Sequence, residues 1–400
     1  MIHLPASGID MAWWPLLLIG FTVGVVGGYF GIGGAWLVTP ALNIFGFPMI
    51  YAVGTDMTHI VGKSIVATFR HWKFGHVSAV IAFTMLLGTF SGVEIGAQVV
   101  YYLTQKGLAG TTIRIVYMCI LAFLCFYMFY DYLRARRIEI TTGKKVGDVV
   151  GTSVSRWLHE ATATLPPILR CRNTGMVMSF WFIVFIALFT GFVAGFLGIG
   201  GGLVRVPAMV YLMGLPTKVA VGTDLFEVMF SGAYGCFTYS LKGGVELVAA
   251  VIMLLGAAVG AQFGTICTKY VHGIFIRLLF SITCAFAFVA VLLKQLARGY
   301  ERVYEKGIEA VLLKAGYTKA QLTGLMLKQD VMQHYMVEVA KRPDWFEAWK
   351  MAAAYTKAGG VFVLTAASLL TGVILFQLVR GVIQERRAKL ALEAQARATR

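Results

Sequence analysis

Charged side chains are scarce in this chain. Lys, Arg, Asp and Glu make up only 14% of its 400 residues, whereas hydrophobic residues make up 58% and the mean hydropathy is +0.75. A soluble domain usually carries about 25% charged residues. The shortage of charge therefore disfavours a soluble enzyme or binding domain and predicts a membrane protein.

Acidic residues are scarcer still, with 19 Asp and Glu against 35 Lys and Arg, which gives a net charge of +16. An excess of basic residues can indicate nucleic-acid binding. In this chain the basic residues cluster between and after apolar blocks, and residues 134–172 hold eight of them with three acids. Such clusters are typical of cytoplasmic loops of membrane proteins, so we expect no nucleic-acid partner.

Motifs for catalysis and for metal binding are also missing. The sequence contains no H-E-x-x-H, no G-x-S-x-G and no Walker A motif, and none of its six cysteines forms a C-x-x-C pair. We therefore predict no enzymatic activity, no cofactor and no metal site. The N-terminal segment has no Lys or Arg before its first apolar block and no A-x-A site after it, which predicts a retained first helix.

Long apolar runs are abundant. Val177–Leu197 contains 21 residues without a charge, and about 20 helical residues suffice to cross the hydrocarbon core of a bilayer. Comparable runs predict helices at 13–30, 51–69, 77–103, 113–133, 177–197, 219–239, 245–268, 274–294 and 359–380.

Two parts of the chain resemble each other. GVVGGYFGIGG starts at residue 24 and GFVAGFLGIGG starts at residue 191, 167 positions later, and a VGTD segment follows in each, at Val53–Asp56 and Val221–Asp224. Proline follows the glycines in both, as Pro40 and Pro207. Matches in the same order at a nearly constant spacing predict a duplicated unit.

These patterns predict an all-α polytopic membrane protein built from two homologous multi-helix repeats, each with a Gly/Pro-broken segment, plus one extra C-terminal transmembrane helix. If the broken segments are re-entrant, the repeats are parallel, and if they cross fully, the repeats are inverted. The expected parts are repeat 1 at 11–133, a basic cytoplasmic linker at 134–176, repeat 2 at 177–294, an amphipathic polar insert at 295–357, the extra helix at 359–380 and a basic tail at 381–400.

The glycine-rich breaks are the first candidate site. Broken backbone at membrane depth is tolerated only inside protein or beside water, and paired breaks in two halves mark substrate sites of secondary transporters. Backbone N–H groups at a half-helix start attract anions. Close helix packing is the alternative explanation. The candidate substrate-binding glycines are Gly31, Gly33, Gly34, Gly198, Gly200, Gly201 and Gly202.

Charges inside apolar segments are costly and suggest function. Asp56, His59 and Lys63 fall on one helical face, and Asp224 and Glu227 fall at the matching places of repeat 2. We predict Lys63 as a substrate ligand and the other four as ion-coupling residues. Both Asp residues could instead cap helices after a Gly-Thr pair, and a lone His in a helix is more often just hydrogen-bonded.

Three kinds of residue complete the prediction. Arg205 is an isolated guanidinium that could bind an oxyanion or pair with Asp224 or Glu227. Thr55 and Thr223 could cap a helix or line the pathway as substrate ligands. Glu94 lies within an apolar run, where it could pair with Lys63 or carry a proton as a coupling residue.

The motifs GIGGAWLVTP with VGTD and GIGGGLVRVP with VGTD resemble the sulfite exporter TauE/SafE family over about 20–133 and 185–294. The resemblance implies a secondary transporter that moves sulfite, an organosulfonate or a similar small anion across the cytoplasmic membrane, coupled to H⁺ or Na⁺. The alternative is a membrane assembly or scaffold protein without transport. The oligomeric state stays open, a homo-oligomer included.

Overall fold

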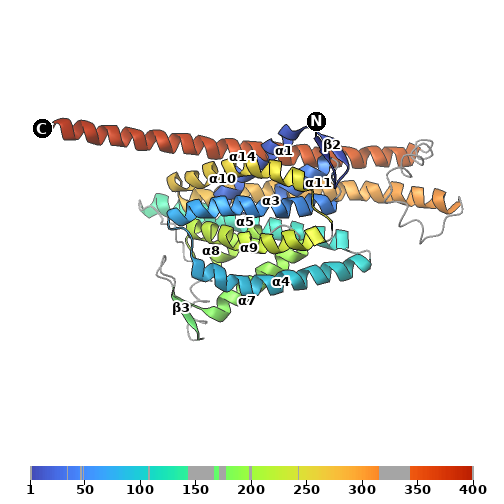
Figure 1. The fold of residues 1–400 in the computed structure, drawn as a ribbon, viewed down its shortest axis with the longest axis horizontal. Helices are drawn as coiled ribbons and strands as arrows, with labels where there is room; N and C mark the ends of the chain where they lie inside the picture. Colours follow the sequence, from blue (N-terminus) through green and yellow to red (C-terminus); the bar gives the residue numbers. More distant parts are fainter. Residues whose placement is uncertain are drawn as a thin grey trace. The chain divides into compact units, whose positions relative to one another are not determined.

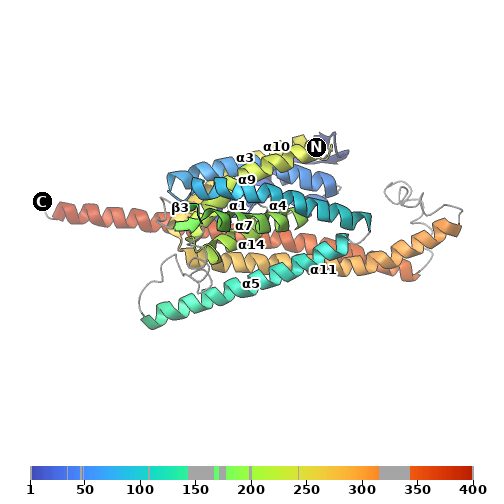
Figure 2. The ribbon, with the colours of Figure 1, turned by 90° about the horizontal axis from the view of Figure 1, so that it is seen from below.

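The computed structural model describes residues 2–33, 35–45, 47, 49–106, 109–142, 166–170, 177–197, 201–241, 243–314 and 343–398. The chain divides into two compact units, one made of Met1–Ala285 with Leu364–Arg400 and one made of Phe286–Val363. Helices dominate both units (Figures 1 and 2). The all-α prediction is therefore confirmed.

Helices in the two predicted repeats follow the same order. The first set is α1 (Trp13–Phe30), α2 (Ala35–Ile44), α3 (Met49–Lys73), α4 (Ala79–Gln105) and α5 (Ala109–Thr142). The second set is α7 (Phe180–Leu197), α8 (Gly202–Tyr211), α9 (Thr217–Leu241), α10 (Leu247–Tyr270) and α11 (Gly273–Lys314). The first three helices of each set have the same lengths, 18, 10 and 25 residues.

Glycines with positive φ mark the breaks. Gly31 has a φ of 80° and its N–H donates to the carbonyl of Gly27, which ends α1 in a left-handed cap. Gly201 has a φ of 76° and stands at the start of α8. The helices that follow the breaks, α2 and α8, have ten residues each, about 15 Å of length, or half of a bilayer core.

Seven of the described helices are long and apolar enough to cross a membrane: α1, α4, α5, α7, α10, α11 and α14 (Pro343–Ala398). The 25-residue helices α3 and α9 are long enough as well, but they carry the internal charges that the sequence singles out. We include both among the membrane-spanning helices because each packs against a helix of that group, α3 on α10 and α9 on α4.

Short strand pairs, which the sequence does not predict, accompany the helices. β1 (Ile2–Leu4) pairs with β2 (Ile9–Met11), and β3 (Ile168–Arg170) pairs with β4 (Val177–Ser179), both antiparallel. Most of the predicted linker, at 143–165 and 171–176, and the middle of the predicted insert, at 315–342, lie outside the described residues.

The C-terminal part is one continuous helix where three segments are predicted. α14 begins at Pro343 and continues for 56 residues through the end of the insert, the extra helix and most of the tail. Proline is well suited to a first helical turn. In the unit Phe286–Val363, α14 packs on α11 through the ring pairs Phe286–Phe362 and Tyr300–Tyr355.

Two close helix pairs join the predicted repeats to each other. Gly20, Gly24 and Gly28 of α1 lie against α10, where a Cβ atom on any of them would overlap the backbone of Met253, Ala257 or Ala261. In the same way, Gly88, Gly92 and Gly96 of α4 lie against α7. Contact positions increase together along both partners, so each pair is parallel. Small residues four apart permit such close backbone contact.

The central helices α3 and α9 run in opposite directions. Near the end of α3, His71 lies beside Gly222, while Met57, nearer its start, lies beside Gly235. Helices at the same place in the two predicted repeats therefore point oppositely, as the inverted of the two topologies requires.

α3 runs parallel to α10, because Thr55 lies beside Glu246 and Arg70 beside Gln262. Since α1 is also parallel to α10, the chain returns between α1 and α3 to the side from which α1 came.

Candidate functional site

The two glycine-rich breaks meet at the centre of the helical bundle. Gly31 lies against Val221 of α9, and Gly202 lies against Ile32 and the carboxylate of Asp224. Gly33 lies against Ile60 and Val228, on α3 and α9. Of the predicted glycines, Gly34, Gly198 and Gly200 lie outside the described residues. The breaks thus bring residues about 170 positions apart in sequence to one place.

Six titratable side chains are buried at this place, and each is at most 1% exposed: Asp56, His59, Lys63, Arg205, Asp224 and Glu227. They come from α3, α8 and α9. The Asp residues lie well inside α3 and α9, which begin at Met49 and Thr217. The N-cap alternative for Asp56 and Asp224 is therefore wrong.

Arg205 holds two carboxylates. Its Nη1 lies 3.2 Å from Oδ1 of Asp224 and also contacts Oε2 of Glu227. Ser231 Oγ donates to the same Glu227 oxygen at 3.3 Å. Three further polar atoms of this group make no hydrogen bond among the described residues: Arg205 Nε, Asp224 Oδ2 and Glu227 Oε1. The ion pairs that the sequence offers as the alternative to anion binding are both present, with hydrogen-bonding capacity left over.

Lys63 binds backbone carbonyls at the break between α1 and α2. Its Nζ donates to the carbonyl of Gly33 and lies 3.4 Å from that of Ile32. The prediction that Glu94 could pair with Lys63 is wrong, because α4 places Glu94 beside Tyr234 of α9, whose hydroxyl donates to Glu94 Oε2 at 3.2 Å. Gln98 Nε2 donates to the other carboxylate oxygen at 3.3 Å.

Asp56 and His59 form a second buried pair. His59 Nδ1 lies 3.1 Å from Oδ1 of Asp56, one helical turn away. Neither carboxylate oxygen of Asp56 has a well-aligned hydrogen bond among the described residues, and neither has Nε2 of His59. A buried carboxylate that is so weakly satisfied is costly. The pair could therefore accept a proton or a small cation.

Thr55 and Thr223 join the predicted repeats through backbone hydrogen bonds. Thr55 Oγ1 accepts the N–H of Glu246 at 3.0 Å, just before α10, and Thr223 Oγ1 accepts the N–H of Ser78 at 3.0 Å, just before α4. Each threonine thus satisfies a free N–H at the start of a helix from the other half. The sequence offers two roles for these threonines, helix capping and lining the pathway. The observed arrangement is nearer to capping, although the helix that each threonine caps is distant in the sequence.

A cavity of about 150 Å³ leads to Arg205. An engineered cavity of similar size holds benzene, so a small molecule can enter it. Its polar lining comes from Arg205, Ser231, Glu94, Tyr234, Thr238 and Tyr239. The remaining lining is apolar or glycine and comes from Met57, Ile60, Val93, Ala194, Gly195, Val228, Gly232 and Gly235.

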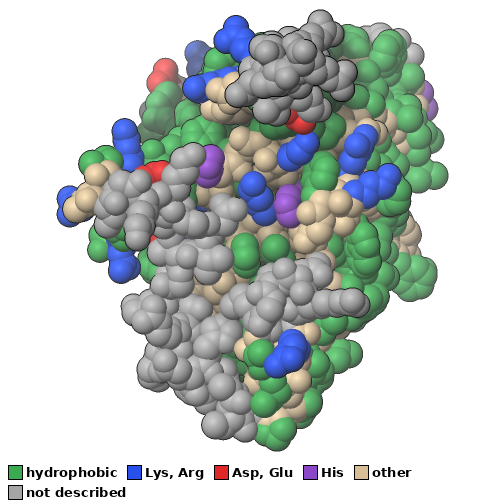
Figure 3. All heavy atoms as spheres, turned by 90° about the vertical axis from the view of Figure 1, so that its left-hand side faces the viewer, with side chains coloured by type: hydrophobic (Ala, Val, Ile, Leu, Met, Phe, Trp, Pro, Cys, Tyr) green, Lys and Arg blue, Asp and Glu red, His purple; other side chains and the backbone are tan. Residues whose placement is uncertain are grey.

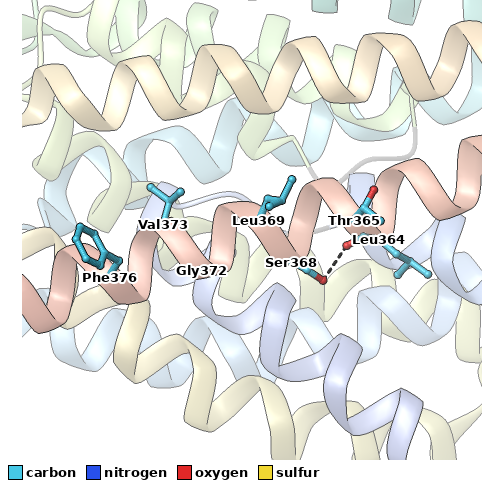
Figure 4. Close-up of a pocket in the computed structure, with 7 residues that line it drawn as sticks. All are labelled: Leu364, Thr365, Ser368, Leu369, Gly372, Val373 and Phe376. Atoms are coloured by element: carbon cyan, nitrogen blue, oxygen red, sulfur yellow. Dashed lines mark hydrogen bonds between the residues drawn. The ribbon is translucent and has the colours of Figure 1, made fainter.

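A second hollow is a poorer candidate. It lies on α14 and is lined by Leu364, Thr365, Ser368, Leu369, Gly372, Val373 and Phe376 (Figure 4). It contains no charged group, and the Ser368 hydroxyl donates to the Leu364 carbonyl of its own helix at 2.9 Å. An ion would find no counter-charge there, so we place the candidate site at Arg205.

Buried polar contacts that the sequence did not nominate surround the site. Arg277 of α11 binds Asp131 of α5 at 2.9 Å and Thr217 at the start of α9 at 2.9 Å. Tyr211, at the end of α8, donates to the same carboxylate at 3.2 Å. The sequence contains a signal for Arg277, because this residue is a charge within an apolar run. Asp131 gives a weaker signal, because it lies near the end of such a run. Metal-ligand clusters are absent from the described residues.

Comparison with known proteins agrees with the fold. The profile of the family described as sulfite exporter TauE/SafE matches residues 16–291. A probable membrane transporter protein of Xylella fastidiosa is 30% identical over 264 residues, which are 62% of this chain and 80% of that protein. The probable membrane transporter protein YunE of Bacillus subtilis is 25% identical over 258 residues, 62% of this chain and 86% of that protein. No solved structure matches the chain significantly.

Proposed function

This chain belongs to the sulfite exporter TauE/SafE family of multi-pass membrane transporters, and from that premise we propose that it is a secondary transporter for a small sulfur oxyanion or organosulfonate. The observation that carries the proposal is Arg205, which is 1% exposed at the end of a cavity about 150 Å³ in volume. A planar guanidinium binds a sulfonate or carboxylate through two parallel hydrogen bonds.

Anion binding at Arg205 is an exchange. Arg205 is occupied by Asp224 and Glu227, so an incoming anion takes the place of one carboxylate. The displaced carboxylate then lies buried beside another negative charge, which is unfavourable unless it gains a proton or a cation. We place this exchange at Glu227, because it contacts Arg205 and accepts a hydrogen bond from Ser231, which lines the cavity together with Arg205.

The balance of charge supports coupling to a cation. Asp56, Asp224 and Glu227 give three negative charges, against two positive charges from Lys63 and Arg205, all of them buried. An anion would add a further negative charge to a site that already has an excess. Uptake of H⁺ or Na⁺ at Glu227, or at the weakly satisfied pair of Asp56 and His59, offsets that addition.

Alternating access fits the arrangement of the helices. Inverted repeats that meet at broken helices are the usual architecture of secondary transporters, with the site at the repeat interface. The cavity follows α9 from Val228 to Tyr239 and so extends toward the C-terminal end of that helix. We propose that this conformation is open on that side and closed on the other.

The test is flux of labelled sulfite and of a labelled sulfonate into proteoliposomes that contain the full chain, under H⁺ and Na⁺ gradients. We expect Arg205→Lys to raise KM about tenfold or more, because lysine keeps the charge that Asp224 and Glu227 require but lacks the two-pronged donor. Arg136→Lys, at an exposed site on α5, is the matched control and should leave flux unchanged. Unchanged kinetics of Arg205→Lys would exclude the ligand role of Arg205.

A further inference from the structure

The cavity at Arg205 also contains an acid. Glu94 lines it from α4, and its two carboxylate oxygens are oriented by the neutral side chains of Tyr234 and Gln98. Among the ion pairs of the described residues, none involves Glu94. The carboxylate therefore presents a negative charge to the cavity without a basic partner in the described part of the chain.

Such a charge is costly at this position. Glu94 lies within the apolar stretch Ala79–Val100, and its neighbours on the helix include exposed apolar side chains such as Phe90 and Ile95. An acid in this setting is generally retained for a function. At the matching place of the second set of helices stands Gln262, which is neutral and accepts a hydrogen bond from Arg70 at 3.0 Å. The acid is thus a feature of one side of the site only.

Neighbouring parts of α9 contact the two charged residues of the cavity. Glu227, which contacts Arg205, and Tyr234, which contacts Glu94, are seven residues apart on α9. Seven residues are two helical turns, or about 10 Å along the axis. This short spacing on one helix favours a small ligand with opposite charges joined by a short chain.

We infer that the substrate is a dipolar aminosulfonate, whose sulfonate binds Arg205 and whose ammonium group binds Glu94. The inference rests on the function proposed above and specifies its substrate class. Tyr234 and Tyr239 also line the Glu94 end, and aromatic rings attract an ammonium group. A cavity lined by one cation, one anion and apolar side chains is complementary to a short molecule with the same three parts.

The test compares two ligands that differ only in the ammonium group, 3-aminopropane-1-sulfonate and propane-1-sulfonate. Their binding to the purified full chain is measured by calorimetry without an ion gradient. We expect the aminosulfonate to bind about tenfold more tightly, as a charged hydrogen bond implies. Glu94→Gln should reduce that preference to about twofold or less, because the aminosulfonate loses its counter-charge and propane-1-sulfonate loses none.

Glu139→Gln is the matched control, because this acid lies near the end of α5 and does not line the cavity; it should keep the full preference. Equal affinities of the two sulfonates for the wild-type chain would overturn the inference and leave the proposed function in place. Equal weakening of both ligands by Glu94→Gln would also overturn it and would assign Glu94 to ion coupling. Failure of both sulfonates and of sulfite to bind would overturn the proposed function as well.

Discussion

At the scale of single residues, the site depends on competition for one guanidinium. Arg205 contacts both Asp224 and Glu227, yet its Nε and one oxygen of each acid make no hydrogen bond among the described residues. Removing one partner of a buried ion pair costs roughly 3–5 kcal/mol because the other charge stays uncompensated. With two acids on one guanidinium, loss of a single acid leaves the positive charge paired, so the site can exchange ligands without exposing an isolated charge.

Glu227→Gln tests this competition. Glutamine has the same shape but cannot compete as an anion, so we expect an organosulfonate to bind several-fold more tightly than it binds the wild-type chain. Calorimetry measures the affinity of both chains, with Glu139→Gln as the control. Weaker binding by Glu227→Gln would contradict the exchange.

At the scale of helices, glycine determines how closely the two sets of helices approach. Gly256, Gly260 and Gly264 of α10 face the backbone of α1, while Gly191 and Gly195 of α7 face that of α4. The glycine-rich pattern thus has two separate meanings in this protein. Glycines at intervals of four serve helix contact, whereas Gly31 and Gly201, with positive φ, belong to the breaks. The packing explanation therefore holds for the glycines at intervals of four, while the substrate-binding role of Gly31 and Gly201 stays a prediction.

Gly260→Ala should destabilise the protein. A Cβ atom at this position would overlap the carbonyl oxygen and neighbouring backbone of Phe21, and relief of such overpacking costs roughly 1–3 kcal/mol. Gly372→Ala on α14 is the matched control, because nothing lies within 4 Å of its added carbon and alanine is the better helix former. Thermal unfolding in detergent should show a lower melting temperature for the first variant only. Equal melting temperatures would contradict the close contact of α1 and α10.

The two helices that carry the site are the least apolar of the predicted long helices. α3 and α9 bear five of the six titratable groups buried at the site, and for that reason neither is among the candidate spans. Their burial follows from packing, since α3 contacts α9 and α10 and α9 also contacts α4. The polarity of a central transport helix is thus a consequence of its position inside the bundle.

At the scale of the whole molecule, the direction of each helix defines two ends of the helical bundle. The end of α3, the start of α9 and the end of α10 lie together and carry Lys73, Lys218 and Lys269. Figure 3 shows Lys, Arg and His side chains gathered at this end. By the positive-inside rule we predict that this end is cytoplasmic and that the end with β1 and β2 faces the opposite side.

Cysteine labelling in intact cells measures this orientation. In a variant without the six native cysteines, Ser240→Cys near the end of α9 should react with a membrane-impermeant maleimide. Lys73→Cys, at the opposite end of the bundle, should react only after permeabilisation. The side chains at both positions are exposed. A difference in labelling therefore reports the side of the membrane and not burial within the protein. Labelling of Lys73→Cys in intact cells would reverse the orientation.

The sequence by itself determined the membrane class, the approximate places of the long helices and the six buried titratable residues of the candidate site, whereas it did not nominate Arg277 and Asp131. These follow from local properties, namely apolar runs long enough to span a bilayer, glycines that interrupt them, and charges too costly to occur there without a role. The duplication stays a prediction from the sequence, and the matching order of helices agrees with it.

Only the tertiary structure decided which groups meet. Arg205 holds Asp224 and Glu227, Lys63 serves two carbonyls, Glu94 joins Tyr234, and each of the two threonines binds the start of a distant helix. The tertiary structure alone also shows that α3 and α9 run in opposite directions. The physical reason is that these contacts join segments up to about 190 residues apart, and local sequence does not encode which face of one helix packs on which face of another.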